Sequence, residues 1–148
     1  MDYSTVLIAT DGSKCSMNAV KSGIDLAKVL SANVILLYVM DMHSIIESIA
    51  VKSGHTSSIK NVEAIIEEKA DEVLNETLIQ YRYDKITKLT MEGIPKDVIN
   101  SIAQEHNVDL IIMGTHGRTG LKRLLMGSVA EHVLRYSKIP VMIVSSNL

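Results

Sequence analysis

Four short runs of almost purely apolar residues constrain the fold of this chain more than any other feature of its sequence. They cover residues 5–10, 33–40, 108–113 and 140–144, and they are rich in aliphatic and β-branched side chains. A strand with one exposed face alternates apolar and polar residues, whereas these runs do not, so they predict strands buried on both faces. The last run begins at Pro140, a placement compatible with an edge of the sheet.

A further segment, residues 85–91, mixes threonine and lysine with apolar residues and is therefore expected to form an edge strand. Apolar stripes with helical spacing lie between the strands and predict amphipathic helices. The stripes comprise Met17, Val20, Ile24, Ala27 and Leu30; Val62, Ile65, Ile66, Ala70, Val73, Leu74 and Leu78; and Val98, Ile99, Ile102 and Ala103. A fourth helix is predicted from Ser128 to about Tyr136, because Ser128-Val129-Ala130-Glu131 fits the capping-box pattern.

Strands and helices thus alternate along the chain, and this order predicts a parallel sheet with helices on both faces. The length of 148 residues is that of one ordinary domain, so we expect a single doubly wound α/β domain over residues 1–148. The least regular stretch, roughly residues 41–58, is a candidate mobile loop.

Charge and composition limit the classes of binding partner and the cellular compartment that we expect for this chain. The formal net charge is −2 with acidic and basic residues intermixed, so we expect neither a nucleic acid nor an anionic membrane as partner. The single cysteine, Cys15, allows no intrachain disulfide and suits a reducing compartment. The first residues show no signal-peptide pattern and no apolar run is long enough to cross a bilayer. A cytoplasmic location is expected.

Ligands of doubly wound sheets bind beyond the carboxyl ends of the strands, where residues 11–13, 41–43 and 114–128 should lie. The third segment is the most informative. Gly114 and Gly117 allow the backbone to approach a ligand closely, while Gly127 and Ser128 at a helix start offer amides and a hydroxyl to an anion. Phosphate is the expected anion, yet the spacing fits neither a P-loop nor the dinucleotide-binding fingerprint.

The spacing of Gly114, two residues, Gly117, nine residues and then Gly127-Ser128 resembles the nucleotide-binding signature of ATP-binding universal stress proteins. The resemblance extends from Asp11 to the segment 139–141. It implies an adenine nucleotide alpha hydrolase-like fold with strand order 3-2-1-4-5, and ATP at the carboxyl ends of the strands. It further implies Mg²⁺ or Mn²⁺ held through the phosphates without a named protein ligand, and homodimers formed through the last strand, Val141 to Val144.

The same resemblance implies which residues bind the nucleotide. Asp11 would lie near the ribose and phosphates, and the backbone around Val39 would recognise adenine. Met113 and Gly114 would line the base and ribose. The full set of implied binding residues is Thr10, Asp11, Gly12, Val39, Met113, Gly114, His116, Gly117, Arg118, Gly127, Ser128 and Val129.

Several of these residues also have a purely structural interpretation. Gly114 and Gly117 could merely shape a tight turn after a strand. Ser128 could act as an N-cap, which is compatible with phosphate binding by the same helix start. Asp11 could cap the following helix or fix a turn with its neighbour.

The sequence assigns no catalytic residue. His116 could be a general base or could contact solvent or phosphate, and Cys15 could be redox-active or a plain small residue. The remaining histidines show no metal-ligand spacing: His43, His55, His106 and His132. Three functions therefore stay open: an ATP-binding regulatory or stress-response protein, a dimeric interaction module with incidental nucleotide binding, and a slow ATPase.

Overall fold

Five parallel strands and the helices that connect them make up the described part of the chain. The computed structural model describes residues 2–43, 46–47, 59–116 and 126–145. Its elements are β1 (Thr5–Thr10), α1 (Lys14–Leu30), β2 (Asn33–Met40), α3 (Ile59–Tyr81), β3 (Ile86–Glu92), α4 (Pro95–Glu105), β4 (Leu110–Gly114), α5 (Ser128–Tyr136) and β5 (Val141–Val144). All strand pairs are parallel and the order is β3-β2-β1-β4-β5. The expected fold class and strand order are confirmed.

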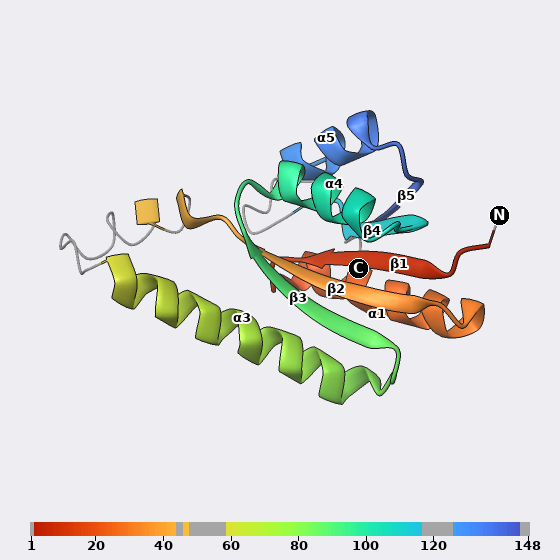
Figure 1. Ribbon diagram of the computed structural model, residues 1–148, viewed down its shortest axis with the longest axis horizontal. Helices are drawn as coiled ribbons and strands as arrows, with labels where there is room; N and C mark the ends of the chain where they lie inside the picture. Colours follow the sequence, from red (N-terminus) through yellow and green to blue (C-terminus); the bar gives the residue numbers. More distant parts are fainter. Residues whose placement is uncertain (1, 44–45, 48–58, 117–125, 146–148) are drawn as a thin grey trace.

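The central strand β1 shows why the apolar runs are continuous. Val6, Leu7 and Ile8 have no exposed surface. Val6 and Ile8 pack in the cluster formed with α1 and α3, whereas Leu7 packs in the cluster formed with α4 and α5. Figure 1 shows these two helical layers on opposite sides of the sheet. Because both faces are covered, every position of the strand requires an apolar side chain.

The two edge predictions are confirmed. β3 lies at one edge, where Thr87 and Lys88 are exposed, and β5 lies at the other edge, where its four residues are partly buried. β4 begins two residues later than the apolar run 108–113 suggests, since the pairing of β1 with β4 starts at Val6 and Leu110. The Val108 N–H donates to the Ala103 carbonyl at 2.9 Å and the Asp109 N–H to the Thr5 carbonyl at 2.8 Å.

The apolar stripe of α3 is narrower than the sequence predicts. Val62, Ile66, Ala70 and Leu74 are buried against the sheet, but Ile65 is 63% exposed. The prediction that Ile65 belongs to the buried face is wrong, because α3 contacts the sheet along one line of residues and Ile65 lies to its side. The first turns of the helix extend past the end of the sheet in Figure 1.

Polar contacts at the amino-terminal end of the sheet join neighbouring connecting segments of the chain. The Asp109 carboxylate accepts hydrogen bonds from the backbone N–H groups of Ser4 and Thr5 and from the Ser4 hydroxyl, each at 2.9 Å. The Thr5 N–H, followed by the Ser4 hydroxyl, lowers the pKa of Asp109 below its ordinary value of 3.8. The Tyr83 hydroxyl donates to the Ala32 carbonyl at 2.7 Å, and burial raises the pKa of this tyrosine. Both contacts join segments that are distant in sequence.

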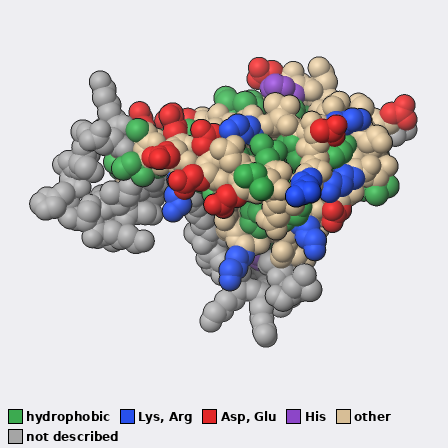
Figure 2. All heavy atoms as spheres, turned by 90° about the horizontal axis from the view of Figure 1, so that it is seen from below, with side chains coloured by type: hydrophobic (Ala, Val, Ile, Leu, Met, Phe, Trp, Pro, Cys, Tyr) green, Lys and Arg blue, Asp and Glu red, His purple; other side chains and the backbone are tan. Residues whose placement is uncertain are grey.

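The surface formed by α1 and α3 carries charges of both signs. Figure 2 shows acidic and basic side chains there, interspersed with small apolar areas. Among the described residues, no helix combines the length and the apolar character needed to cross a membrane. The candidate mobile loop falls largely outside the described residues.

Candidate functional site

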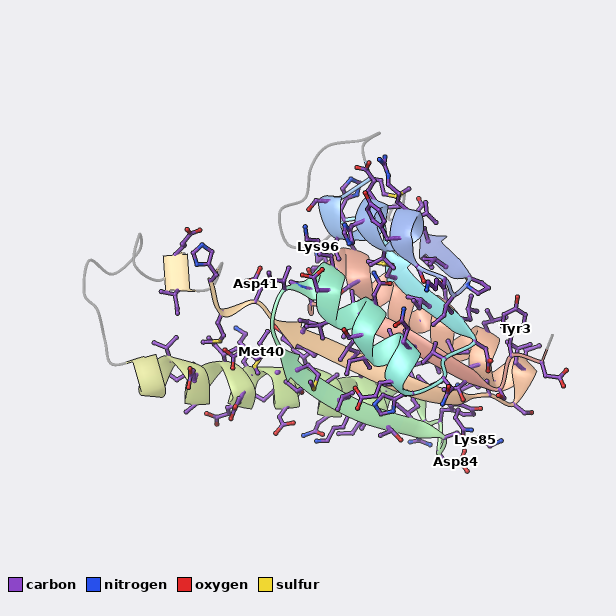
Figure 3. All side chains as sticks on the ribbon, turned by 45° about the horizontal axis from the view of Figure 1, so that its top comes forward. Tyr3, Met40, Asp41, Asp84, Lys85 and Lys96 are labelled. Atoms are coloured by element: carbon purple, nitrogen blue, oxygen red, sulfur yellow. The ribbon has the colours of Figure 1, made fainter. Side chains whose placement is uncertain are left out.

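A cleft of about 320 Å³ opens at the carboxyl ends of β1, β2 and β4 and at the starts of α4 and α5. Figure 3 marks this end of the sheet with Met40 and Asp41, while Tyr3, Asp84 and Lys85 lie at the opposite end. The lining residues are Ala9, Thr10, Asp11, Ser16, Tyr38, Val39, Asp41, Pro95, Ile99, Met113, Gly114, Thr115, His116, Gly127, Ser128, Val129 and Ala130. The cleft therefore lies where ligands of doubly wound sheets are found.

The cleft brings together most of the residues expected to bind a nucleotide. Those that line it are Thr10, Asp11, Val39, Met113, Gly114, His116, Gly127, Ser128 and Val129. Gly12 lies instead along a neighbouring hollow of about 370 Å³, beside Val73 and Tyr38. Gly117 and Arg118 lie outside the described residues.

Two glycines of the cleft owe their lack of a side chain to packing within the protein. A Cβ atom on Gly114 would lie 3.1 Å from the Cys15 carbonyl oxygen and 3.2 Å from the Cys15 Sγ. A Cβ atom on Gly127 would lie 2.9 Å from the Thr115 carbonyl oxygen. The Gly127 N–H donates to that same oxygen at 2.6 Å. Close packing within the protein, which differs from the turn suggested for Gly114 from the sequence, therefore favours glycine at both positions, and both residues border the cleft.

The helix α5 begins at Ser128 as expected, but the capping-box prediction is wrong. Gly127 is the N-cap, with extended backbone (φ −61°, ψ 156°), and no side chain caps the helix. The bond from the Gly127 N–H to Thr115 holds this residue in the cap position, so Ser128 becomes the first helical residue. Its exposed hydroxyl borders the cleft instead of closing the helix end.

Asp11 fixes a turn and does not cap α1. Its Oδ1 atom accepts the Ser13 N–H at 2.9 Å, and Ser13 is the N-cap, whose Oγ accepts the Ser16 N–H at 3.2 Å. Gly12 between them has φ +79°, a conformation that favours glycine. This turn places Asp11 at the border of the cleft while α1 begins directly behind it.

His116, which follows β4, is held by its neighbour. The Thr115 Oγ1 lies 3.0 Å from His116 Nδ1 and 3.8 Å from the Cys15 Sγ. No group of three or more His, Cys, Asp or Glu side chains that could hold a metal ion occurs in the described part of the chain. The described lining carries the carboxylates of Asp11 and Asp41 and no lysine or arginine.

Several lining residues were not among the predicted binding residues. Asp41 belongs to the segment 41–43, which the strand-end argument had already placed at this end of the sheet. The same argument could have selected Tyr38, because β2 ends beside β1. Ser16 lies in the first turn of α1, three residues after the N-cap Ser13, and this place at the helix start behind β1 could have drawn attention to it. Pro95 and Ile99 reach the cleft only because α4 packs over this end of the sheet, and no local pattern indicates that.

The sheet order and the position of the cleft define a doubly wound α/β protein with a cleft at the carboxyl ends of its strands, where proteins of this class bind their ligands. The sequence profile described as the universal stress protein family matches residues 2–145. The chain belongs to the universal stress protein family.

Individual relatives agree with this assignment over nearly the full chain. Universal stress protein MJ0531 of Methanocaldococcus jannaschii is 35% identical over 144 residues, which cover 96% of this chain and 82% of the relative. MJ0577 of the same organism is 31% identical, covering 96% of this chain and 94% of that relative. The solved structure of MJ0577 superimposes with a TM-score of 0.82, covering 100% and 99% of the two chains. A universal stress protein in complex with cAMP superimposes with a TM-score of 0.69 at 26% identity, covering 98% of each chain.

Proposed function

We propose that this chain is an ATP-binding universal stress protein that acts as a nucleotide-dependent regulatory or stress-response protein. The observation that carries the proposal is the convergence of Asp11, Val39, Met113 and the Gly127-Ser128 helix start on one cleft. The complex of a relative with cAMP supports the adenine nucleotide as ligand class. We place this function in the cytoplasm, where the free thiol of Cys15 stays reduced.

The chemistry of the cleft suits the three parts of a nucleotide. Met113 and Ile99 are buried and apolar and offer a surface for the adenine ring, and the backbone of Val39 offers hydrogen bonds to its edge. The Asp11 carboxylate can accept hydrogen bonds from ribose hydroxyls. The first N–H groups of α5 have no intrahelical acceptor and favour phosphate oxygens.

Charge balance supports a divalent cation as part of the bound complex. A triphosphate would enter a cleft whose described lining already carries two carboxylates, Asp11 and Asp41. Mg²⁺ or Mn²⁺ on the phosphate oxygens would offset the repulsion, and both ions prefer oxygen ligands. We therefore expect ATP affinity to fall when the divalent cation is removed with EDTA.

Calorimetry of the nucleotide-free protein with Mg-ATP tests the binding proposal. The informative variant is Asp11→Asn, because its side-chain oxygen can still accept the Ser13 N–H while the charge is lost. Asp84→Asn, at the opposite end of the sheet, is the matched control and should bind as the unmodified protein does. Absence of saturable heat up to about 1 mM ATP, equivalent to a binding free energy weaker than about −4 kcal/mol, would refute the proposal.

The alternative of a dimeric interaction module has its own support in β5. This strand is apolar, forms an edge of the sheet and leaves Val141 to Val144 partly exposed. An edge strand of this composition can pair with a second copy. Sedimentation should show a homodimer that Ile143→Lys converts to monomer, whereas Thr87→Lys on the opposite edge should leave it intact. A monomer at every concentration of the unmodified protein would remove the dimer.

Hydrolysis is a separate question, because no catalytic residue is assigned. Asp11 and His116 both border the cleft and could orient a water molecule near metal-bound phosphate. Product analysis of the unmodified protein, Asp11→Ala and His116→Ala distinguishes turnover from binding. Equal and slow background release in all three would exclude an enzymatic role for these two residues.

A further inference from the structure

Two buried hydroxyl groups border the cleft from behind the Asp11 turn. Thr10, at the end of β1, is 5% exposed and Ser16, in the first turn of α1, is 4% exposed. Their oxygen atoms lie 2.9 Å apart. Thr77, also buried in the described part of the chain, donates to the Val73 carbonyl within its own helix at 2.8 Å. The pair of Thr10 and Ser16 differs from Thr77 because it joins a strand end to a helix start.

Hydrogen counting fixes the direction of each bond in this pair. The Ser16 hydroxyl donates its single hydrogen to the Ser13 carbonyl at 3.0 Å, so it can only accept from Thr10. The Thr10 hydroxyl therefore donates to Ser16, and it accepts the Gly12 N–H at 3.1 Å. The chain of bonds runs from the Gly12 amide through Thr10 and Ser16 to the Ser13 carbonyl. Both hydroxyl hydrogens are used within the protein.

These bonds enclose Asp11 on both sides of its turn. Gly12 is held through its N–H by Thr10, and Ser13 is held through its carbonyl by Ser16 and through its N–H by Asp11 itself. The turn is therefore fixed before any ligand arrives. A binding group held in its productive orientation loses less conformational freedom on binding.

We propose that the buried Thr10–Ser16 hydroxyl pair is a positioning device, which orients the Asp11 carboxylate toward the ribose of the nucleotide and thereby sets the preference for ligands with ribose hydroxyls. The inference rests on the proposed nucleotide-binding function. It assigns to Thr10 and Ser16 a role through Asp11, not a contact with the nucleotide.

Thr10→Val tests the device, because valine keeps the shape of threonine and removes its hydroxyl. The measurement is the ratio of the dissociation constants for 2′,3′-dideoxy-ATP and ATP, each with Mg²⁺. We expect Thr10→Val to weaken ATP about tenfold and dideoxy-ATP less than twofold, so that the ratio collapses. Asp11→Asn should produce the same collapse, and the double variant should show no further loss, since both substitutions act on one interaction.

Two controls separate positioning from general destabilisation. Thr10→Ser keeps the hydroxyl and should retain the ratio of the unmodified protein. Thr77→Val removes a buried hydroxyl remote from the described lining of the cleft and should lower stability without changing the ratio. In nucleotide-free protein, Thr10→Val should also accelerate hydrogen exchange at the Gly12 amide, because that amide loses its acceptor.

The outcomes distinguish this inference from the proposed function. Normal ATP binding by the unmodified protein, together with an unchanged ratio in Thr10→Val, would overturn the positioning role alone. Equal weakening of ATP and dideoxy-ATP would overturn it as well, because the hydroxyl would then act on the whole cleft. Absence of ATP binding by the unmodified protein would overturn the proposed function and this inference together.

Discussion

Substitution of Gly127 by alanine tests whether the close contact between residues 127 and 115 requires glycine. The added Cβ atom would lie 2.9 Å from the Thr115 carbonyl oxygen and 3.4 Å from the His116 Cα. Both are backbone atoms, so no flexible side chain can move aside. The bond from the Gly127 N–H to the same oxygen, 2.6 Å long, has to lengthen for the new atom to fit.

The magnitude follows from three contributions. Overpacking against a rigid neighbour costs about 1–3 kcal/mol. Alanine is also a poorer N-cap than glycine, by roughly 0.5–1 kcal/mol. Alanine also restricts the unfolded chain more than glycine does, which stabilises the variant by about 0.4–1 kcal/mol, since alanine can adopt the native φ of −61°. The net loss in the free energy of unfolding is about 2 kcal/mol, which corresponds to a fall in Tm of roughly 4–8 °C for a chain of this length.

Urea unfolding of the two proteins measures this loss, and an unchanged m-value would show that the transition is comparable. Ser128→Ala is the matched control for stability, because the Ser128 side chain does not cap the helix, and it should change stability by less than about 0.5 kcal/mol. If Gly127→Ala matched the unmodified protein within that margin, the close approach to Thr115 would not be the reason for glycine at this position.

Three further substitutions test other parts of the structure. Asp109→Asn should lower the free energy of unfolding by about 1 kcal/mol at pH 7. Because the pKa of Asp109 is lowered in the folded protein, this difference from the unmodified protein should persist above pH 3.8 and vanish as the pH falls through the native pKa. Urea unfolding measured at a series of acidic pH values would show this. Tyr83→Phe leaves the Ala32 carbonyl without its donor and should cost about 1 kcal/mol by thermal unfolding, and an unchanged Tm would contradict this. Leu36→Ala empties a fully buried position of β2 and should cost about 3 kcal/mol by urea denaturation, and a loss below 1 kcal/mol would argue against the described core.

The internal contacts of Gly127 also determine which substitutions are suitable for testing nucleotide binding. Gly127 was expected to offer its amide to phosphate, yet this N–H donates to the Thr115 carbonyl, and a Cβ atom on Gly127 would meet the same oxygen. A bulky substitution there would disturb the helix start as well as any ligand. Asp11→Asn and Ser128→Ala are cleaner tests of binding, because neither adds an atom to the tight contact with Thr115.

Much of the fold could be predicted from the sequence, because a strand that is buried on both faces appears as a continuous apolar run. The runs that form β1 and β2 end at the predicted residues, and the Thr and Lys side chains of β3 correctly indicated an edge. The carboxyl-end rule then located Asp11 and the Gly127-Ser128 segment at one cleft. These predictions depend on which side chains are apolar and on the order of elements, and the chain displays both directly.

Only the tertiary structure decided which atoms meet. Gly127 is the N-cap instead of Ser128, because the Gly127 N–H donates a hydrogen bond to the carbonyl oxygen of Thr115. Ile65 is exposed because the sheet covers a single line of α3. Such outcomes depend on the register and packing of segments that are remote in sequence or lie on separate elements, and periodicity within one segment contains no information about the neighbour it will face.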